Sequence, residues 1–495
     1  MSMDPKTFPY IDLFAGAGGL GEGFSACSFG NRKVFDGVLS VENNGQACET
    51  LRLRHFFRQF DKNDVPEDYY AYLQGDLSRE LLFQRYAPEA QKAMHCVLEL
   101  TLEDKSRDRL NAEIARRIKG HDKWVLLGGP PCQAYSLAGR ARRTGDAKLK
   151  TDPRQTLYIQ YLNLLSDFAP PVFVMENVQG LLSARIDNHA ILEKILAYLR
   201  MERHHYRLFS IATGKEVAFS EDFPTLLVNT ADYGIPQKRK RLFLLGIRGD
   251  IRVTPRHLQR CDQLTVEDAI GDLPAIRSKI SRRTSADSSD WLSAVLALRN
   301  VDMQGIAPDL VEHVYRRLHE LESGNDTIRK KCPPEMTDFY QWSHDRRLAV
   351  IPQHEARGHM PSDLMRYFFA SAYAEHTGKS PKLPDFPVEL LPQHRNVIEC
   401  TGKMIFNDRF RVQLKDAPST TVTAHIQKDG HYFIHYDPLQ CRSLTVREAA
   451  RLQTFPDNYF FEGHRTEQYR QIGNAVPPLF ATKIAAIVHD ILERA

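Results

Sequence analysis

A cysteine that follows two prolines, in the segment Gly128 to Ser136, carries the strongest chemical signal in this sequence. The prolines stiffen the backbone ahead of Cys132, and the apolar run Trp124 to Leu127 before them is typical of a short buried strand. The sulfur should therefore be exposed beyond the end of that strand. Arginines that follow closely would lower the pKa of the thiol toward the thiolate, which is the reactive form. We predict that Cys132 is a catalytic nucleophile.

A carboxyl group stands at the end of a second apolar run. Glu176 directly follows Val172 to Met175, which is typical of a fully buried strand. Burial beside such a strand disfavours the charged form, so we expect a raised pKa and a protonated carboxyl. In that state Glu176 can donate a proton or a hydrogen bond to a ring nitrogen. The alternative is a glutamate that is only ion-paired at the edge of the sheet.

A glycine-rich turn, Asp12 to Gly19, follows the predicted strand Phe8 to Phe14. Glycines let the backbone approach a ligand closely. Glu42 comes after the next predicted strand, Val34 to Val41, where an acidic residue can bind ribose hydroxyls. Asp76, after a third strand, could supply a carboxylate to an adenine amino group. The pattern indicates a cofactor that contains a nucleoside, but it does not separate NAD from S-adenosyl-L-methionine.

A thiol, a proton donor and a nucleoside site together indicate one reaction. C5 of cytosine is too weak a nucleophile to accept a methyl group directly, but addition of a thiolate at C6 makes C5 enamine-like. A proton donor near N3 makes that addition possible. Cys132 and Glu176 can supply these two functions, so the residues predict methylation of cytosine at C5. They identify no base for the loss of the C5 proton, a step that an ordered water can perform.

The elements that carry these side chains alternate between strands and helices in the first half of the chain. That alternation is typical of an α/β protein with a parallel sheet, whose carboxyl edge binds ligands. We expect a later strand at Leu242 to Ile247 and a helical excursion of mixed charge at Leu77 to Lys123. We predict a catalytic domain at residues 1–255, a second, irregular domain at 256–440, and a segment at 441–495 that completes the first domain.

The last residues, Pro478 to Ala495, carry an apolar stripe with a helical period. The residues of the stripe are Ile484, Ile487, Val488, Ile491 and Leu492. We expect this helix to pack back onto the first domain.

The composition is that of a soluble globular protein, with 42% hydrophobic and 26% charged residues among 495. No apolar run approaches the roughly 20 residues that span a bilayer, which excludes a membrane protein. The N-terminus shows no signal peptide, which favours a cytoplasmic location. The eight cysteines are scattered, so we expect neither a zinc site nor disulfides, and most thiols should be buried.

Basic residues gather in two clusters on either side of the predicted strand that ends at Glu176. One cluster runs from Arg140 to Arg154 and the other from Lys238 to Arg260, although the net charge of the chain is only +4. A solvated loop would explain either cluster alone. Because both lie beside candidate catalytic residues, we predict that they contact phosphates.

The ordered motifs resemble those of the cytosine-C5 DNA methyltransferase family, of the bacterial restriction-modification type, over residues 8–249 and 438–490. The resemblance implies a Rossmann-like sheet that binds S-adenosyl-L-methionine and no metal. It places Phe14 on the adenine ring, Glu42 on the ribose and Asp76 on the adenine amino group. The residues that it implies for cofactor binding are Asp12, Phe14, Ala15, Gly16, Gly18, Gly19, Glu42, Asn43, Asp76, Leu77, Pro131, Leu157, Asn474 and Ala475.

For catalysis the resemblance implies Cys132 with three further residues. Glu176 should contact N3 of the cytosine, Arg241 its O2, and Arg239 should anchor the catalytic loop or a phosphate. The target base would leave the stack of a double-stranded DNA, and the loop Ser136 to Arg154 would close over it. The second domain would read the sequence in the major groove. The residues expected on DNA are Gln133, Ser136, Arg140, Arg142, Arg143 and Arg154.

Other segments match the family or depart from it. Arg442 to Tyr459 resembles the motif that organises the recognition domain, and Pro418 to Ala424 resembles the strand that returns from it. The stretch Leu77 to Lys123 is longer than is usual in the family, and no function is evident for it. Tyr135 replaces the usual phenylalanine, a mild change beside the nucleophile.

Three alternatives stay open. A nicotinamide-dependent oxidoreductase would use the glycine turn and Glu42, but it gives no role to the segment around Cys132. A non-catalytic DNA-binding module would need a degraded site, whereas Cys132, Glu176 and both motif arginines are present. A branch of the same family methylates tRNA, but the long recognition region and the absence of that branch's Cys-Phe-Thr signature favour DNA. We expect a monomer that acts separately from a cognate restriction endonuclease.

Overall fold

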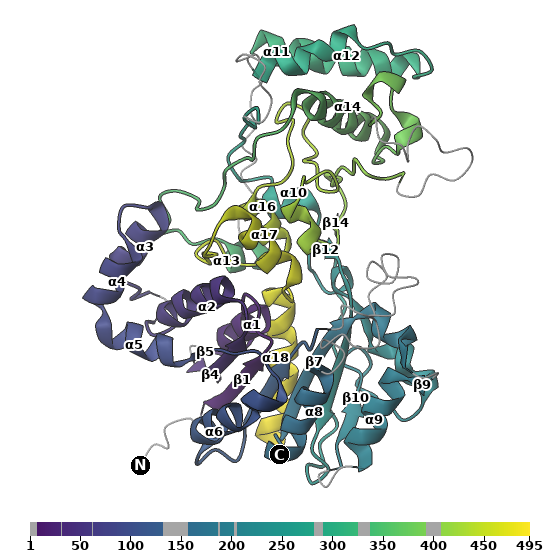
Figure 1. Ribbon diagram of the computed structural model, residues 1–495. Coiled ribbons are helices and arrows are strands. Elements are labelled where there is room, and N and C mark those ends of the chain that lie inside the picture. Colours follow the sequence, from purple (N-terminus) through teal and green to yellow (C-terminus); the bar gives the residue numbers. More distant parts are fainter. Residues whose placement is uncertain are drawn as a thin grey trace.

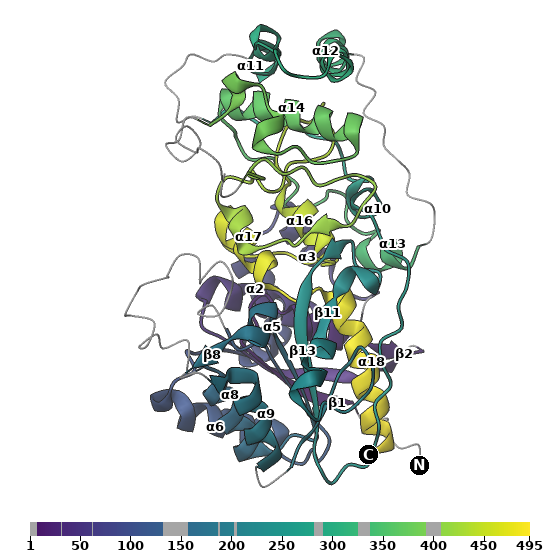
Figure 2. The same cartoon turned by 90° about the vertical axis from the view of Figure 1, so that its right-hand side faces the viewer.

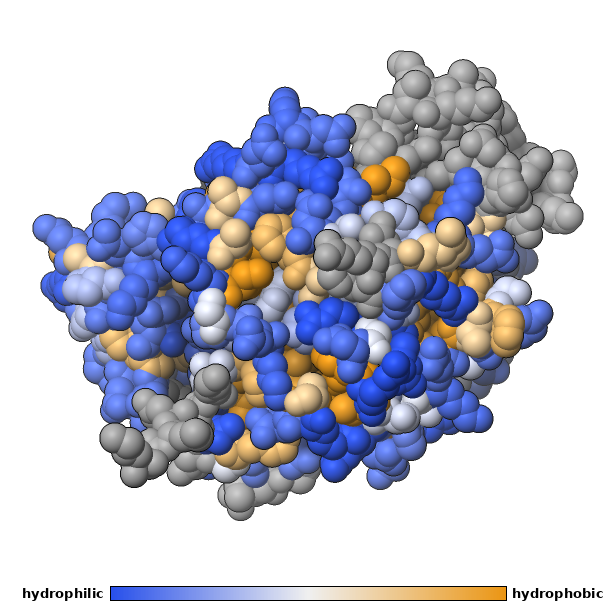
Figure 3. Space-filling view, turned by 90° about the horizontal axis from the view of Figure 1, so that it is seen from below, coloured by the Kyte–Doolittle hydropathy of each residue, from blue (hydrophilic) through white to orange (hydrophobic). Residues whose placement is uncertain are grey.

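The computed structural model describes residues 7–30, 32–61, 63–131, 157–186, 189–201, 205–281, 291–324, 337–392 and 407–495. Along the long axis of the molecule, these residues form a lower part built on a sheet, a middle group of short helices and an upper helical lobe (Figure 1). Seen from below, the surface of the lower part is mostly hydrophilic, and groups of hydrophobic residues appear between hydrophilic ones (Figure 3).

One eight-stranded sheet forms the centre of the lower part. Its parallel strands, in spatial order, are β5 (Val97–Glu99), β4 (Phe35–Glu42), β1 (Phe8–Leu13), β6 (Val125–Gly128) and β7 (Val172–Val178). The antiparallel pairings beyond β7 involve β13 (Lys240–Ile247), β10 (Arg207–Phe209) and β11 (Leu227–Asn229). The predicted α/β class is confirmed, and the five strands whose residue ranges were predicted from sequence are present near their expected bounds.

Helices cover both faces of this sheet (Figures 1 and 2). One face packs against α1 (Gly19–Ala26) and α18 (Pro478–Arg494). The other face packs against α6 (Arg107–Ile118), α8 (Leu157–Phe168) and α9 (Ile191–Met201). Because both faces are buried, β1 and β6 are apolar almost without interruption. The stripe predicted on the last helix is confirmed, since all of its members are buried against the sheet.

Arg465–Arg494 is the one stretch in the described ranges that is long and apolar enough, by composition alone, to cross a membrane. It consists of α17 (Arg465–Asn474) and α18, which Pro477 separates. In the fold, 72% of its most apolar window is buried. It therefore behaves as a pair of core helices.

A helical insertion, Glu67–His95, follows α2 (Gly45–Phe57) and packs beside it. The insertion consists of α3 (Glu67–Gln74), α4 (Arg79–Arg85) and α5 (Ala87–His95). Helices were predicted from Leu77 onward, and α4, α5 and α6 confirm this, but the same stretch also contains β5. That strand has only three residues, so no apolar run reveals it. The prediction that Asp76 follows a third strand is wrong, because Asp76 follows α3.

The upper lobe has its own apolar core. It contains α11 (Trp291–Leu296), α12 (Pro308–Ser323) and α14 (Pro361–Thr377). We expected no clear period here, and that is wrong for α12, in which the buried residues Leu310, Val314, Leu318 and Leu321 recur at helical spacing. The rest of the lobe is less regular and includes η9 (Leu383–Asp385) and η10 (Val388–Leu390).

Between the lower part and the lobe lies a group of short helices that we call the hub. It consists of α10 (Val266–Ile270), α13 (Asp338–Ser343), η11 (Ala424–Gln427), α16 (Val446–Leu452) and α17. Its core takes residues from 264–273, 422–433 and 444–475, and thus from both sides of the predicted boundary at 441. The domain boundaries at 256 and 441 stay a prediction.

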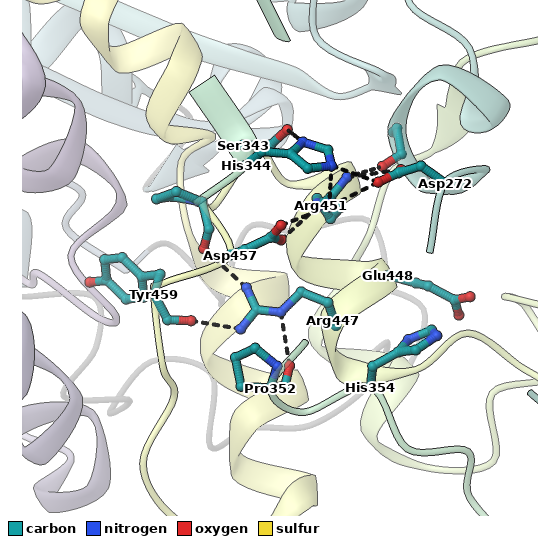
Figure 4. A network of polar contacts seen from close by, with 12 residues as sticks. Asp272, Ser343, His344, Pro352, His354, Arg447, Glu448, Arg451, Asp457 and Tyr459 are labelled. Carbon is teal, nitrogen blue, oxygen red and sulfur yellow. Dashed lines mark hydrogen bonds and ion pairs between the residues drawn. The ribbon is translucent and has the colours of Figure 1, made fainter. Parts of the chain in front are cut away.

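Arginines of α16 tie the hub together from inside (Figure 4). Arg447 donates to the carbonyl oxygens of Pro352, Pro456 and Tyr459. Arg451 pairs with Asp457 and Asp272.

The remaining described elements are β2 (Ser28–Phe29), β3 (Arg32–Lys33), β8 (Arg185–Ile186), β9 (His189–Ala190), β12 (Gln237–Lys238), β14 (Ser419–Thr420), η1 (Asp104–Ser106), η5 (Gln179–Ser183), η6 (Ser220–Leu226), η7 (Thr230–Asp232) and η8 (Ala297–Asn300).

The close contact between α1 and α18 yields a prediction. A Cβ added at Gly23 would lie 2.4 Å from the Cβ of Ala481 and 2.5 Å from the carbonyl oxygen of Pro478. We expect Gly23→Ala to lower the free energy of unfolding by about 1 to 3 kcal/mol, because the helices must move apart. Urea denaturation measures this change.

Gly45→Ala is the matched control. There the nearest atom to an added Cβ is Glu99 Oε1, at 3.2 Å, which belongs to a half-exposed side chain that can move. We expect a change below about 0.5 kcal/mol. Equal losses in the two variants would contradict the packing explanation.

Candidate active site

A cavity of about 640 Å³ lies at the carboxyl edge of the parallel strands. It is lined by residues that follow β1, β4, β5, β6 and β7, and by the link between α17 and α18. The predicted cofactor residues that line it are Asp12, Phe14, Ala15, Gly16, Gly19, Glu42, Asn43, Pro131, Leu157, Asn474 and Ala475. The predicted catalytic residues that line it are Glu176, Arg239 and Arg241. Both sets meet because parallel strands end at one edge.

Three predicted cofactor residues do not line this cavity. Gly18 adopts a left-handed conformation, with φ 78°, at the start of α1 and so shapes the turn from outside the cavity. Asp76 and Leu77 do not line the cavity either, and their predicted contacts with the cofactor stay a prediction. Leu77 packs in the core of the insertion instead. The strand that pairs with β4 at this edge is β5, and Leu100 to Leu102, which follow β5, line the cavity. No pattern in the sequence indicated this three-residue strand.

The glycine turn is fixed to the end of β4 by one carboxylate. Glu42 accepts hydrogen bonds from the backbone N–H of Gly16 and of Asn44, each at 2.9 Å. Asn44 in turn caps α2 by accepting from the N–H of Ala47. A carboxylate has about four acceptor positions, so Glu42 keeps capacity for a ligand hydroxyl.

Gly19 allows the turn to lie against the C-terminal link. A Cβ added there would lie 2.1 Å from the carbonyl oxygen of Val476, which is closer than any side chain could approach. Asn474 and Ala475 precede this contact and line the same cavity. The link after α17 and the glycine turn Asp12 to Gly19 therefore form adjacent walls of one site.

Asp12 is buried at the base of the cavity and forms no ion pair in the described part of the chain, although, against the effect of burial, the backbone N–H of Gly21 and Arg58 lower its pKa slightly. Its side chain is 1% exposed, and its Oδ2 atom lacks a hydrogen-bond partner in the described ranges. Burial raises the pKa of Asp12 to about 7. The carboxyl is thus poised to change its charge near neutral pH.

Glu176 forms an ion pair that the sequence did not reveal. Its Oε1 atom lies 3.0 Å from Nε of Arg241, and both side chains are mostly buried. The two residues are diagonal neighbours, because β13 pairs antiparallel with β7 and Arg241 lies opposite Val178. The structure thus shows the contact of the alternative that the sequence left open, a glutamate that is ion-paired at the edge of the sheet.

The segment that leads to the predicted nucleophile is anchored beside this ion pair. Asn177 Nδ2 donates to the carbonyl oxygen of Pro130 at 3.1 Å, and a Cβ added at Gly129 would lie 3.0 Å from Glu176 Oε2. Cys132 and the predicted DNA contacts lie outside the described residues, namely Gln133, Ser136, Arg140, Arg142, Arg143 and Arg154. Asn177 was missed as a functional residue, although it follows Glu176 directly.

Arg239 binds protein backbone rather than an anion in the part of the chain that is described. It is 1% exposed and donates to the carbonyl oxygens of Val422 and Gly473. Burial, together with the nearby Arg241, lowers the pKa of Arg239 well below its usual range. Arg239 thus joins the catalytic strand to the return segment and to α17, and its predicted contact with the catalytic loop or a phosphate stays a prediction.

The second basic cluster is divided by β13. Arg241 lies at the cavity end of the strand, whereas Arg248 follows its far end and pairs with Asp250. Arg256 pairs with Asp490 of α18. Lys238 and Lys240 remain exposed near the cavity. An eight-residue strand therefore separates the two ends of this cluster, and its predicted phosphate contacts stay a prediction.

A pair of glutamines locks the hub to the cavity wall, and sequence reasoning missed both. Gln237 donates to the side chain of Gln453 and accepts from the N–H of Val422. Gln453 donates to the carbonyl oxygen of Ala475. Their partners lie up to 216 positions away, so no local pattern could have identified them.

Three of the five described thiols are buried, as expected for most of them. Cys27, Cys48 and Cys441 are buried, while Cys96 is partly exposed and Cys261 exposed. Burial raises the pKa of Cys27 to about 11 and that of Cys48 to about 12. These two thiols are therefore poor nucleophiles at neutral pH.

Comparison with known proteins gives a consistent result. A family model for C-5 cytosine-specific DNA methylases matches residues 86–489. The chain is 32% identical to type II methyltransferase M.Bpa9945I of Bacillus paralicheniformis, over 97% of this chain and 98% of that protein. It is 28% identical to type II methyltransferase M.AgeI of Thalassovita gelatinovora, over 97% and 98%. A solved prophage-encoded DNA modification methyltransferase from E. coli shares the fold, with a TM-score of 0.54 at 19% identity over 98% of this chain and 100% of that chain.

The charge state of Asp12 yields a prediction about pH. The unfolded chain ionises Asp12 at a pKa of about 3.9, whereas the folded value is about 7. Between these values only the unfolded state loses the proton, so stability falls as pH rises. Asp12→Asn cannot ionise. We therefore expect it to gain about 2 to 3 kcal/mol relative to the native chain between pH 5 and pH 8, measured by urea unfolding.

The exposed Asp61 provides the control, because Asp61→Asn should show no such gain. If Asp12→Asn differs from the native chain by the same amount at both pH values, Asp12 does not titrate as described.

Proposed function

Because the chain belongs to the C-5 cytosine-specific DNA methylase family, we propose that it methylates C5 of a cytosine within a specific duplex sequence, as the methyltransferase of a type II restriction-modification system. One observation carries this proposal. Glu176, Arg241 and the end of the Pro130–Pro131 turn meet at a cavity that also contains the glycine turn and Glu42. A methyl donor and a target base can therefore be held side by side.

The cavity fits S-adenosyl-L-methionine. Phe14 offers an aromatic ring, Glu42 keeps free acceptor positions for ribose hydroxyls, and Asp12 retains a buried oxygen without a partner in the described ranges. Asn474 and Ala475 would close the opposite wall. When bound there, the cofactor supplies an electrophilic methyl group.

In the proposed reaction, the sulfur of Cys132 bonds to C6 of a cytosine that has left the DNA stack. Glu176 holds N3 and Arg241 holds O2. In the free protein these two side chains pair with each other. When the base enters, its O2 takes over the guanidinium from Glu176. The Glu176 carboxyl takes a proton from solvent and donates it to N3 as the sulfur adds to C6, and N3 returns this proton when the sulfur leaves. Loss of the C5 proton and cleavage of the sulfur–C6 bond then restore the aromatic ring.

DNA recognition is assigned to residues 256–440, with the segment Ser136 to Arg154 as the loop that covers the flipped base. Lys238 and Lys240 are exposed beside the cavity and suit the flanking phosphates. We place the enzyme in the bacterial cytoplasm or nucleoid, as a monomer, with any cognate endonuclease acting separately.

A methyl-transfer assay tests the proposal. Radiolabelled S-adenosyl-L-methionine is incubated with the protein and either genomic DNA or tRNA, and we expect label in DNA. Label in tRNA alone would support the tRNA-methylating branch, and hydride exchange without methylation would support an oxidoreductase. Bisulfite sequencing of DNA from cells that express the protein then gives the target sequence.

The nucleophile yields a prediction. We expect Cys132→Ser to abolish turnover, because an alkoxide is not available at neutral pH, while cofactor affinity changes by less than about twofold. Cys261→Ser, at an exposed thiol far along the chain, is the matched control and should retain full activity. Undiminished methylation by Cys132→Ser would remove this residue from the mechanism.

Glu176 yields a separate prediction. Glu176→Gln can still donate a hydrogen bond to N3 but cannot transfer a proton, so we expect kcat to fall by about 10²- to 10⁴-fold. Single-turnover methylation measures this loss. Glu216→Gln breaks an exposed pair with Arg207 at the far side of the sheet and should leave kcat unchanged. A fall of less than about threefold in Glu176→Gln would exclude proton transfer by this carboxyl.

A further inference from the structure

The segment Pro456 to Glu462, which we call the hub loop, touches three parts of the molecule that are far apart in sequence. It follows α16 and contacts the glycine turn, the α3–α5 insertion and the linker Asp345–Leu348, which runs from α13 toward the upper lobe. The insertion overlaps the stretch Leu77 to Lys123, for which the sequence indicated no function. The insertion contacts both the hub loop and the linker.

Asn458 is the centre of these contacts. Its Oδ1 accepts from Arg54 Nη1 at 2.9 Å, and its Nδ2 donates to Asp345 Oδ2 at 2.7 Å. Its backbone oxygen accepts from the hydroxyl of Tyr69 in the insertion, at 2.9 Å. The side chain is 6% exposed, so both ends of one buried amide are satisfied by residues more than 100 positions away. A buried amide that lost either partner would pay a desolvation cost.

On one side these contacts lead to the cofactor turn. Arg54 pairs with Glu22 of α1, the helix that begins directly after the glycines. Burial disfavours the Glu22 carboxylate, but the guanidinium groups of Arg54 and Arg58 outweigh it and hold the pKa of Glu22 at about 2. The next residue of the hub loop, Tyr459, donates its hydroxyl proton to the carbonyl oxygen of Ala17 within the turn itself.

On the other side they lead to the linker of the upper lobe. Tyr70 of the insertion donates to Asp345 at 2.8 Å, and Arg347 lies over the ring of Tyr70, with 4.4 Å from the guanidinium carbon to the ring centre. Arg347 also pairs with Glu67. Leu348 packs against the core of the insertion. The insertion therefore braces the linker against the hub loop.

We propose that Asn458 is a positioning residue that couples the glycine turn to the region that recognises DNA, with the α3–α5 insertion as the brace of this connection. The proposal rests on the assignment of residues 256–440 to DNA recognition. The Asn458 side chain can keep its hydrogen bonds to Arg54 and to Asp345 only when α2 and the linker lie at one fixed distance from each other. Ordering of the turn by cofactor therefore favours the linker position that binds DNA, and by linkage the reverse holds equally.

The experiment measures this coupling directly. The dissociation constant of a duplex that contains the target sequence is determined with and without S-adenosyl-L-homocysteine, for the native chain and for variants. In the native chain we expect the cofactor product to tighten DNA binding by about fivefold or more. In Asn458→Ala we expect this factor to fall below about twofold, while the affinity for S-adenosyl-L-homocysteine alone changes little.

Two further variants separate coupling from folding. Asn458→Asp keeps an acceptor for Arg54 but sets a carboxylate against Asp345, so it should lose the coupling as the alanine variant does. Tyr70→Phe removes one hydroxyl from the brace and should lower the coupling while the protein stays folded. The matched control is Arg85→Ala, which breaks the Asp68 pair on the outer side of the same insertion and should keep the native factor.

Each outcome bears on a distinct claim. A native coupling factor retained in both Asn458 variants, or no coupling in the native chain, would overturn the proposal while leaving the methyltransferase function intact. Absence of duplex binding by the native chain would instead contradict the proposed function, and with it the recognition region on which the coupling depends. Loss of coupling in Arg85→Ala to the same extent would show a general effect of the insertion and would also overturn the role given to Asn458.

Discussion

The structure depends on two buried arginines of α16 whose guanidinium groups are fully hydrogen-bonded. Arg447 and Arg451 are both 1% exposed or less, and each sits where an unpaired guanidinium would be costly. Their partners are carbonyl and carboxylate groups from the segments around 272, 352 and 457. Because none of these groups can move without leaving a buried charge unsatisfied, one short helix sets the distances between three separate stretches of chain.

The geometry of the active site depends on the position of α16 and of the hub helices around it. The floor of the cavity is the edge of the sheet, but one wall is the link after α17. Gln453 of the hub binds Ala475 of this link, and Arg239 beside β13 binds Gly473 at the end of α17. A catalytic domain that ended at 255 would have the strands and the glycine turn but would lack that wall. The return of the chain after the upper lobe is thus a requirement of the site.

Much of the fold was predictable because its signals are local. A buried parallel strand needs an apolar run, and a polar residue directly after such a run must lie at the carboxyl edge. This logic placed Glu42 and Glu176 correctly beside one cavity. The same logic failed for β5, because a strand of three residues gives no apolar run. For this reason a strand was wrongly predicted before Asp76, which follows the helix α3.

What the sequence by itself determined is the set of strand ends and the chemical groups that stand on them, because alternation and burial act over a few residues. Only the tertiary structure decided which partner each group takes. Arg239 turned inward to backbone oxygens, Arg241 paired with Glu176, and Asn458 joined segments hundreds of residues apart. Such pairings depend on distances that are fixed only after the sheet, the hub and the lobe have packed, so no local pattern of residues encodes them.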